Sequence, residues 1–177
     1  MGDFLTDVET LRKRARANIE QGAITDSYGA DRKRVIDVLN GVLATELVCV
    51  LRYKRHFFTA QGINAASVAE EFKQHAEEEQ GHADSVAERI VQLGGEPDFS
   101  PQGLATRSHS EYDQSTELLA MVREDLVAER VAIESYQEIV RWIGNDDPTT
   151  RRVIEEILAV EEEHAEDLVS ILQDMKT

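Results

Sequence analysis

Six side chains that can bind metal recur along the chain in a regular pattern. Two glutamates stand alone and two others are each followed three positions later by a histidine, giving Glu46, Glu79, His82, Glu129, Glu161 and His164. Residues three positions apart share one face of an α-helix, so each E-x-x-H pair could bind an ion from a single helix. Carboxylate and imidazole ligands without thiolate suit iron or manganese, and zinc can also occupy such a site. We therefore expect a metal site, with iron as the first choice, where these side chains meet.

The two halves of the chain repeat this arrangement. The segments Glu46–Tyr53 and Glu129–Tyr136 both follow the pattern E-x-V-x-(V or I)-x-x-Y. An E-x-x-H pair comes later in each half, and the two Glu-to-Glu separations are 33 and 32 residues. The repeat is in register, so the sequence predicts two matching half-sites.

The charge of this set also indicates metal. Each of the six residues falls within the apolar stripe of a helical pattern, as Glu46 does among Leu39, Val42 and Val50. Four carboxylates in one core would repel each other and would each cost several kcal/mol in lost hydration, and no inward Lys or Arg is expected beside them. Two divalent ions would balance four carboxylates. The alternative is that these residues lie on solvated helix faces with incidental histidines.

Three further residues lie near the predicted ligands. Tyr53 and Tyr136 each follow a lone glutamate by two helical turns, where they could donate a hydrogen bond or an electron, or simply pack as core tyrosines. His75 lies one turn before Glu79 on the same side, so it could be a third-shell or entry ligand or a partly exposed histidine. We expect the two tyrosines to support the site and leave the role of His75 open.

Turn residues divide the chain into five expected helices. The first and shortest runs from about Asp3 to Gln21, and the four long ones cover about 31–60, 67–94, 113–143 and 148–175. The sequence Ser67-Val68-Ala69-Glu70 predicts a capping box, and Asp147 followed by Pro148 predicts a capped helix start. Residues 94–112 contain two of the three prolines and no regular period, which indicates a long connection.

This order of elements predicts an all-α fold. Two long helices joined tightly, one long crossover and two more tightly joined helices form an up-down-down-up four-helix bundle. A length of 177 residues suits one domain, with 1–28 as an N-terminal helical extension and 31–175 as the bundle.

Composition limits the partners. A formal net charge of -16 favours cations over nucleic-acid phosphates. The single cysteine, Cys49, excludes an intrachain disulfide and suggests a small buried apolar residue, with a redox role as the alternative. The chain shows no secretory signal and no apolar stretch of roughly 20 residues, so we expect a cytoplasmic protein without a membrane span.

Four segments make the chain similar to the bacterioferritin branch of the ferritin-like superfamily. They are LNGVLATELVCVLRY, EEEQGHADSVAERIVQLGGEP, DLVAERVAIESY and IEEILAVEEEHAEDL, within Leu39–Leu172. The resemblance implies an intrasubunit ferroxidase centre that oxidises Fe(II) with oxygen or peroxide and stores ferric mineral in a hollow cage, protecting against peroxide. It implies that Glu46 and Glu129 are terminal ligands and that Glu79 and Glu161 bridge the two irons. It also implies that His82 and His164 each bind one iron.

The chain departs from that branch at three points. Gln80 stands where bacterioferritins have the methionine that binds haem, so no haem is expected. Only 13 residues follow His164, too few for a fifth helix. The N-terminal extension instead resembles the Dps miniferritins, although the Dps site between subunits is not evident. We expect a homo-oligomer, a dodecamer rather than a 24-mer.

Two other functions stay open. A rubrerythrin-like di-iron peroxidase or an oxygenase would turn over without storing iron, although a rubrerythrin normally has a four-cysteine rubredoxin domain that this sequence lacks. A Dps-type protein that shields DNA is suggested by Arg12, Lys13, Arg14 and Arg16 in the first helix. The acidic total charge makes DNA binding the weaker expectation.

Overall fold

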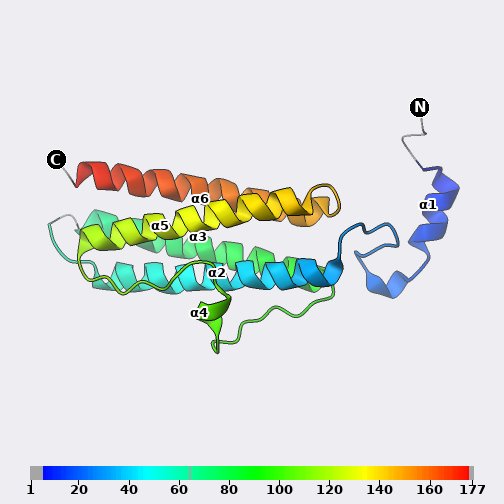
Figure 1. Cartoon of the computed structure of the whole chain (residues 1–177), viewed down its shortest axis with the longest axis horizontal. Helices are drawn as coiled ribbons and strands as arrows, with labels where there is room; N and C mark the ends of the chain where they lie inside the picture. Colours follow the sequence, from blue (N-terminus) through cyan, green and yellow to red (C-terminus); the bar gives the residue numbers. More distant parts are fainter. Residues whose placement is uncertain (1–5, 64, 176–177) are drawn as a thin grey trace.

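The computed structural model describes residues 6–63 and 65–175, and in this part of the chain every regular element is a helix (Figure 1). The elements are α1 (Val8–Ala15), the 3₁₀-helix η1 (Ile19–Gln21), α2 (Arg32–Thr59), α3 (Ala65–Gln92), α4 (Leu104–Arg107), α5 (Leu118–Ile143) and α6 (Pro148–Asp174). None of the described helices is long and apolar enough to serve as a membrane span.

The four long helices form the predicted bundle. In Figure 1, α2 and α6 run in one direction, and α3 and α5 run in the opposite direction. The connection 93–117 returns along the bundle from the end of α3 to the start of α5 and carries the short helix α4 (Figure 1). The up-down-down-up topology with one long crossover is therefore confirmed.

Two apolar clusters fill the bundle. One contains Leu39, Leu43 and Ile90, and the other contains Phe72 and Leu168. Both clusters draw on all four long helices, so the amphipathic stripes seen in the sequence are the buried faces. Most of the polar residues within those stripes are consequently buried between packed helices, while His82 keeps 12% of its side chain exposed.

Two buried arginines are also inside the bundle. Arg89 pairs with Asp147 at 2.9 Å, and Arg52 pairs with Asp125 at 2.8 Å. The second carboxylate oxygen of Asp125 lies 2.8 Å from Nδ1 of His56. Because each arginine is neutralised by its own aspartate, neither is a free cation for the predicted metal ligands.

The helix starts agree only partly with the sequence. Asp147 caps α6 as predicted, since its carboxylate accepts a hydrogen bond from the Thr150 backbone N–H at 2.9 Å. The predicted capping box at Ser67 is wrong, because α3 already begins at Ala65, so that Ser67 lies inside the helix.

The expected start of the third long helix at Asp113 is also wrong. Helix α5 begins at Leu118. The Asp113 carboxylate instead accepts a hydrogen bond from the Ser115 backbone N–H at 2.8 Å, which forms a local turn. Arg55 donates to the backbone oxygens of Gln114 and Ser115, at 3.0 and 2.8 Å, and holds this segment outside the helix.

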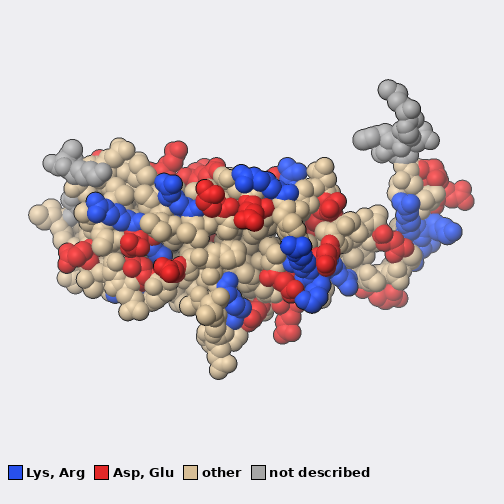
Figure 2. Space-filling view, in the orientation of Figure 1, with Lys and Arg blue, Asp and Glu red and all other residues tan. Residues whose placement is uncertain are grey.

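The N-terminal helix is shorter than predicted. Helix α1 covers only Val8–Ala15, and a left-handed residue, Asn18 with φ of 48°, separates it from η1. The expected start at Asp3 lies outside the described residues. Val8 and Leu11 are 58% and 49% exposed, so no packing extends the helix, and α1 stands apart from the bundle in Figure 1. Its arginines and lysine form a blue cluster in Figure 2.

Candidate metal centre

The six predicted side chains meet inside the bundle. Their ligand atoms form two overlapping groups, and within each group these atoms lie within 4.8 Å of one another. The groups are Glu46, Glu79, His82 and Glu161, and Glu79, Glu129, Glu161 and His164. Glu79 and Glu161 belong to both groups, so they lie between the two half-sites.

One imidazole nitrogen faces the carboxylates in each group. Nδ1 of His82 lies 3.1 Å from Glu161 Oε1, 3.2 Å from Glu46 Oε2 and 3.6 Å from Glu79 Oε2. Nδ1 of His164 lies 3.6 Å from both Glu79 Oε1 and Glu161 Oε2 and 3.9 Å from Glu129 Oε1. Each group therefore brings oxygen and nitrogen ligands from several helices close together.

Several of these atoms are buried without a hydrogen-bond partner. They are Glu79 Oε1, Glu129 Oε2, both carboxylate oxygens of Glu161, and Nδ1 of His164. The four glutamates are at most 1% exposed, so water does not satisfy them from the surface. Because an unpaired buried polar group is costly, this set fits a pair of divalent cations that would take up the free lone pairs.

The proton affinities reflect the crowded charge. Burial, followed by the charge of Glu161, raises the pKa of both Glu79 and Glu129 well above the usual range. Burial opposes protonation of the histidines, but their carboxylate neighbours outweigh it and raise the pKa of His82 to about 12 and of His164 to about 9. Without a cation, the centre therefore retains protons that an incoming metal ion must displace.

The two tyrosines hold the two lone glutamates. The Tyr53 hydroxyl donates a hydrogen bond to Glu129, and the Tyr136 hydroxyl donates one to Glu46. Both tyrosines are buried, and each bond crosses between α2 and α5. The internal repeat thus pairs the tyrosine of each half with the glutamate of the other, and both tyrosines also pack in the core.

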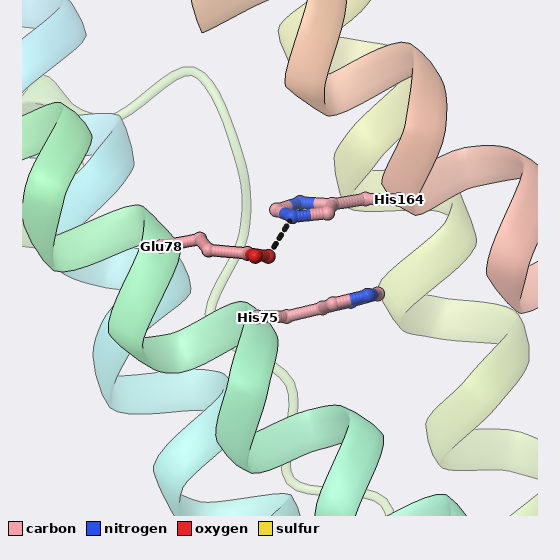
Figure 3. Close-up of side chains that lie close together, drawn as sticks. All are labelled: His75, Glu78 and His164. Atoms are coloured by element: carbon pink, nitrogen blue, oxygen red, sulfur yellow. Dashed lines mark hydrogen bonds and ion pairs between the residues drawn. The ribbon is translucent and has the colours of Figure 1, made fainter.

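Sequence reasoning missed Glu78. Its Oε2 lies 2.8 Å from Nε2 of His164, as the dashed line in Figure 3 marks. This contact occupies the outer nitrogen of His164 and leaves Nδ1 facing the carboxylates. A carboxylate in this position orients a metal-binding histidine. The sequence gives no signal for it, since Glu78 lies in an unbroken run of acidic residues next to the exposed Glu77.

His75 and Cys49 are both buried. The ring of His75 stacks on that of His164 with centroids 3.9 Å apart, so the reading of His75 as partly exposed is wrong. Burial and the neighbouring His164 lower the pKa of His75 to about 3, which keeps its imidazole neutral. Burial and then the charge of Glu79 raise the pKa of Cys49, so its thiol stays protonated within the apolar cluster.

The fold and this centre agree with the comparisons to known proteins. The model of a family described as the ferritin-like domain matches residues 36–177. The chain belongs to the ferritin-like family. A ferritin-like chain of the bacterioferritin and Dps type was predicted from the sequence, and that prediction is confirmed.

Three relatives show the range of the similarity. Bacterioferritin from Desulfovibrio desulfuricans is 29% identical over 136 residues, which cover 76% of this chain and 72% of the relative. The nutrient stress-induced DNA-binding protein from a Nostoc species is 32% identical over 141 residues, 78% of this chain and 77% of the relative. The solved structure of a dodecameric thioferritin, the bacterioferritin-related protein from Bacteroides fragilis, is 35% identical with a TM-score of 0.80, covering 84% of this chain and 89% of that one.

Proposed function

We propose that this chain oxidises Fe(II) to Fe(III) at a two-iron centre and stores the product as ferric mineral in a hollow homo-oligomeric shell. The observation that carries the proposal is the pair of overlapping ligand groups that share Glu79 and Glu161. In this assignment Glu46 and His82 bind one substrate ion, and Glu129 and His164 bind the other. Glu79 and Glu161 bridge the two ions.

The residues account for the charge and proton balance of the reaction. Two Fe(II) ions and one peroxide molecule take up two protons and give two Fe(III) ions and two waters, so each iron loses one electron. With oxygen as the oxidant, the same two electrons and two protons give peroxide. Four carboxylates match the charge of two Fe(II) ions. The protons that His82 and His164 hold before binding are released when the ions enter, because a metal-binding imidazole must be neutral.

The tyrosines and Glu78 keep the ligands in position during this change of charge. Tyr53 and Tyr136 fix Glu129 and Glu46 by hydrogen bonds, while Glu78 fixes the orientation of His164. Hydrogen bonds of this kind to metal ligands fix the orientation of those ligands.

We infer a dodecameric shell for the storage step. The thioferritin from Bacteroides fragilis is described as dodecameric, and this chain covers 89% of it at 35% identity. The net charge of -16 would concentrate Fe(II) around such a shell by electrostatic attraction. A rubrerythrin-like peroxidase would instead be a small oligomer that retains no mineral, so the mass of the assembly and the iron it retains after oxidation separate the two functions.

The test is a rapid-mixing experiment on the assembled protein. Fe(II) is added without oxygen in increasing amounts and then pulsed with peroxide, and the fast oxidation phase should saturate at about two irons per subunit. Glu161→Gln should abolish the fast phase, whereas the control Glu162→Gln, which alters the exposed neighbour, should leave it unchanged. A fast phase that is unaltered in Glu161→Gln means that the centre has been assigned to the wrong residues.

One observation favours DNA binding as a second candidate function. The exposed basic residues Arg12, Lys13, Arg14 and Arg16 lie on or directly after α1, which is set apart from the acidic bundle (Figure 2). One relative is named a nutrient stress-induced DNA-binding protein. Retardation of duplex DNA at low salt, lost when the four residues are changed to alanine, would support this function. No retardation at low salt would exclude it.

A further inference from the structure

A second group of metal-binding side chains lies beside the centre. It consists of Glu71 and His75 on α3 and Asp167 on α6, whose ligand atoms lie within 4.8 Å of one another. Nε2 of His75 is 3.4 Å from Glu71 Oε1 and 3.9 Å from Asp167 Oδ2. None of the three belongs to the six ligands assigned above.

His75 is the feature that points to a ligand here. Its side chain is 0% exposed, and neither ring nitrogen has a hydrogen-bond partner. The ring stacks on that of His164, with centroids 3.9 Å apart, and makes a T-shaped contact with that of Tyr53, with centroids 5.2 Å apart. A buried imidazole with no partner is costly, and its Nε2 faces two carboxylates that a cation could share with it.

The group opens to the surface on its other side. The side chains of Glu71 and Asp167 are 31% and 55% exposed, in contrast to the fully buried His75. Two carboxylates would neutralise one divalent ion, and the imidazole would add a nitrogen ligand. An ion could therefore reach this group from solvent and meet His75 at its inner end.

A competing arrangement of the same histidine is less favourable. His75, Glu78 and His164 also lie close enough to hold an ion. Figure 3, however, shows Glu78 reaching His164, where it occupies Nε2 at 2.8 Å, and Nδ1 of His164 faces the centre. His164 has no nitrogen left for another ion, so Glu71 and Asp167 are the better partners of His75.

We propose that Glu71, His75 and Asp167 form a third divalent-cation site, which binds Fe(II) near the surface and supplies it to the two-iron centre on its His164 side. The binding of a third ion stands on these three residues alone. Its role in supply rests on the proposed ferroxidase function.

The test uses Co(II), which does not oxidise in air as Fe(II) does. Equilibrium binding should give three Co(II) ions per subunit in the unaltered protein and two in the double variant Glu71→Gln, Asp167→Asn. The control Glu77→Gln, Glu166→Gln changes exposed carboxylates of the same helices and should still bind three. We expect the affinity for the third ion to fall at least about tenfold in the first double variant. Anomalous diffraction should place this ion at Nε2 of His75.

Different outcomes contradict different parts of the proposal. The site would be overturned if the unaltered protein bound only two ions, or if the first double variant bound the third ion equally tightly. It would also be overturned by an anomalous peak among His75, Glu78 and His164. With Fe(II), the first oxidation burst should keep its amplitude in that variant while the second burst slows several-fold. An equally fast second burst would remove the supply role. An ion bound at His75 while the two-iron centre stays empty would instead refute the proposed ferroxidase function.

Discussion

Replacing Glu129 with glutamine should stabilise the metal-free protein. Glu129 is 0% exposed, its Oε2 has no hydrogen-bond partner, and burial with the charge of Glu161 raises its pKa. At pH 7 the folded chain must either ionise this buried carboxyl or keep it protonated, and both are unfavourable. Glutamine keeps the shape and an oxygen acceptor for Tyr53 without that cost. We expect a gain of about 1–3 kcal/mol in the free energy of unfolding.

The pH dependence of this gain has a definite sign. A carboxyl whose pKa is raised by folding destabilises the folded state when the pH is above its unfolded-state pKa, about 4.3 for glutamate. It has no such effect when the pH is below that pKa. The advantage of Glu129→Gln should therefore be present at pH 7 and absent at pH 4. Metal acts in the opposite direction, since each ion at 100 times its Kd stabilises the folded state by about 2.7 kcal/mol. The variant should lose this amount for each ion it fails to bind.

Urea denaturation followed by circular dichroism measures both effects. Unfolding is compared with a chelator and with Mn(II), at one fixed subunit concentration because assembly contributes to stability. Glu138→Gln, an exposed position on the same helix, is the matched control and should change neither quantity. A metal-free Glu129→Gln protein that is less stable than the unaltered protein, or one with the same Mn(II) gain, would refute this reasoning.

Three further substitutions test the surroundings of the centre. Asp147→Ala should cost about 3–5 kcal/mol in urea denaturation, because it leaves Arg89 buried without a partner and removes a helix cap. Burial raises the pKa of Asp147, but hydrogen bonds from Thr150 outweigh burial and lower that pKa. The stability that Asp147 contributes should therefore persist above pH 4 and fade as the pH falls further. A loss of stability in Asp147→Ala that is the same at pH 7 and pH 2 would contradict this prediction. Tyr53→Phe should lower Mn(II) affinity, measured by calorimetry, by about tenfold or more, and unchanged affinity would mean that the tyrosine only packs. Glu78→Gln should lower Mn(II) affinity by about 10–100-fold while Glu77→Gln does not, and equal effects of the two would show that general charge, not contact with His164, is responsible.

The sequence predicted those features of the molecule that follow from the helical spacing of apolar residues and from local helix-start signals. Glu46 and Glu129 could be placed inward because apolar residues surround them at helical spacing, and the two E-x-x-H pairs followed the same rule. Asp147 could be recognised as a helix cap from the proline that follows it. These features depend on neighbours within one helix, which a sequence displays directly.

Features that depend on contacts between distant segments were missed or wrongly predicted. Asp113 was expected to start a helix, but Arg55 from α2 holds the following residues in a loop. The sequence left open whether His75 is a ligand or partly exposed, because the ring that stacks on it belongs to His164 on α6. The partnership of Glu78 with that histidine is likewise a contact across the bundle, and no spacing rule within α3 identifies it.

The central claim is that two ions occupy the bundle and share Glu79 and Glu161. It is tested most directly by anomalous diffraction at the iron edge from crystals soaked with Fe(II) in the absence of oxygen. We predict two iron peaks in the centre, one beside His82 and one beside His164, each within bonding distance of both shared glutamates. A single peak confined to one group, or iron bound only to surface carboxylates while the six side chains stay empty, would contradict the claim.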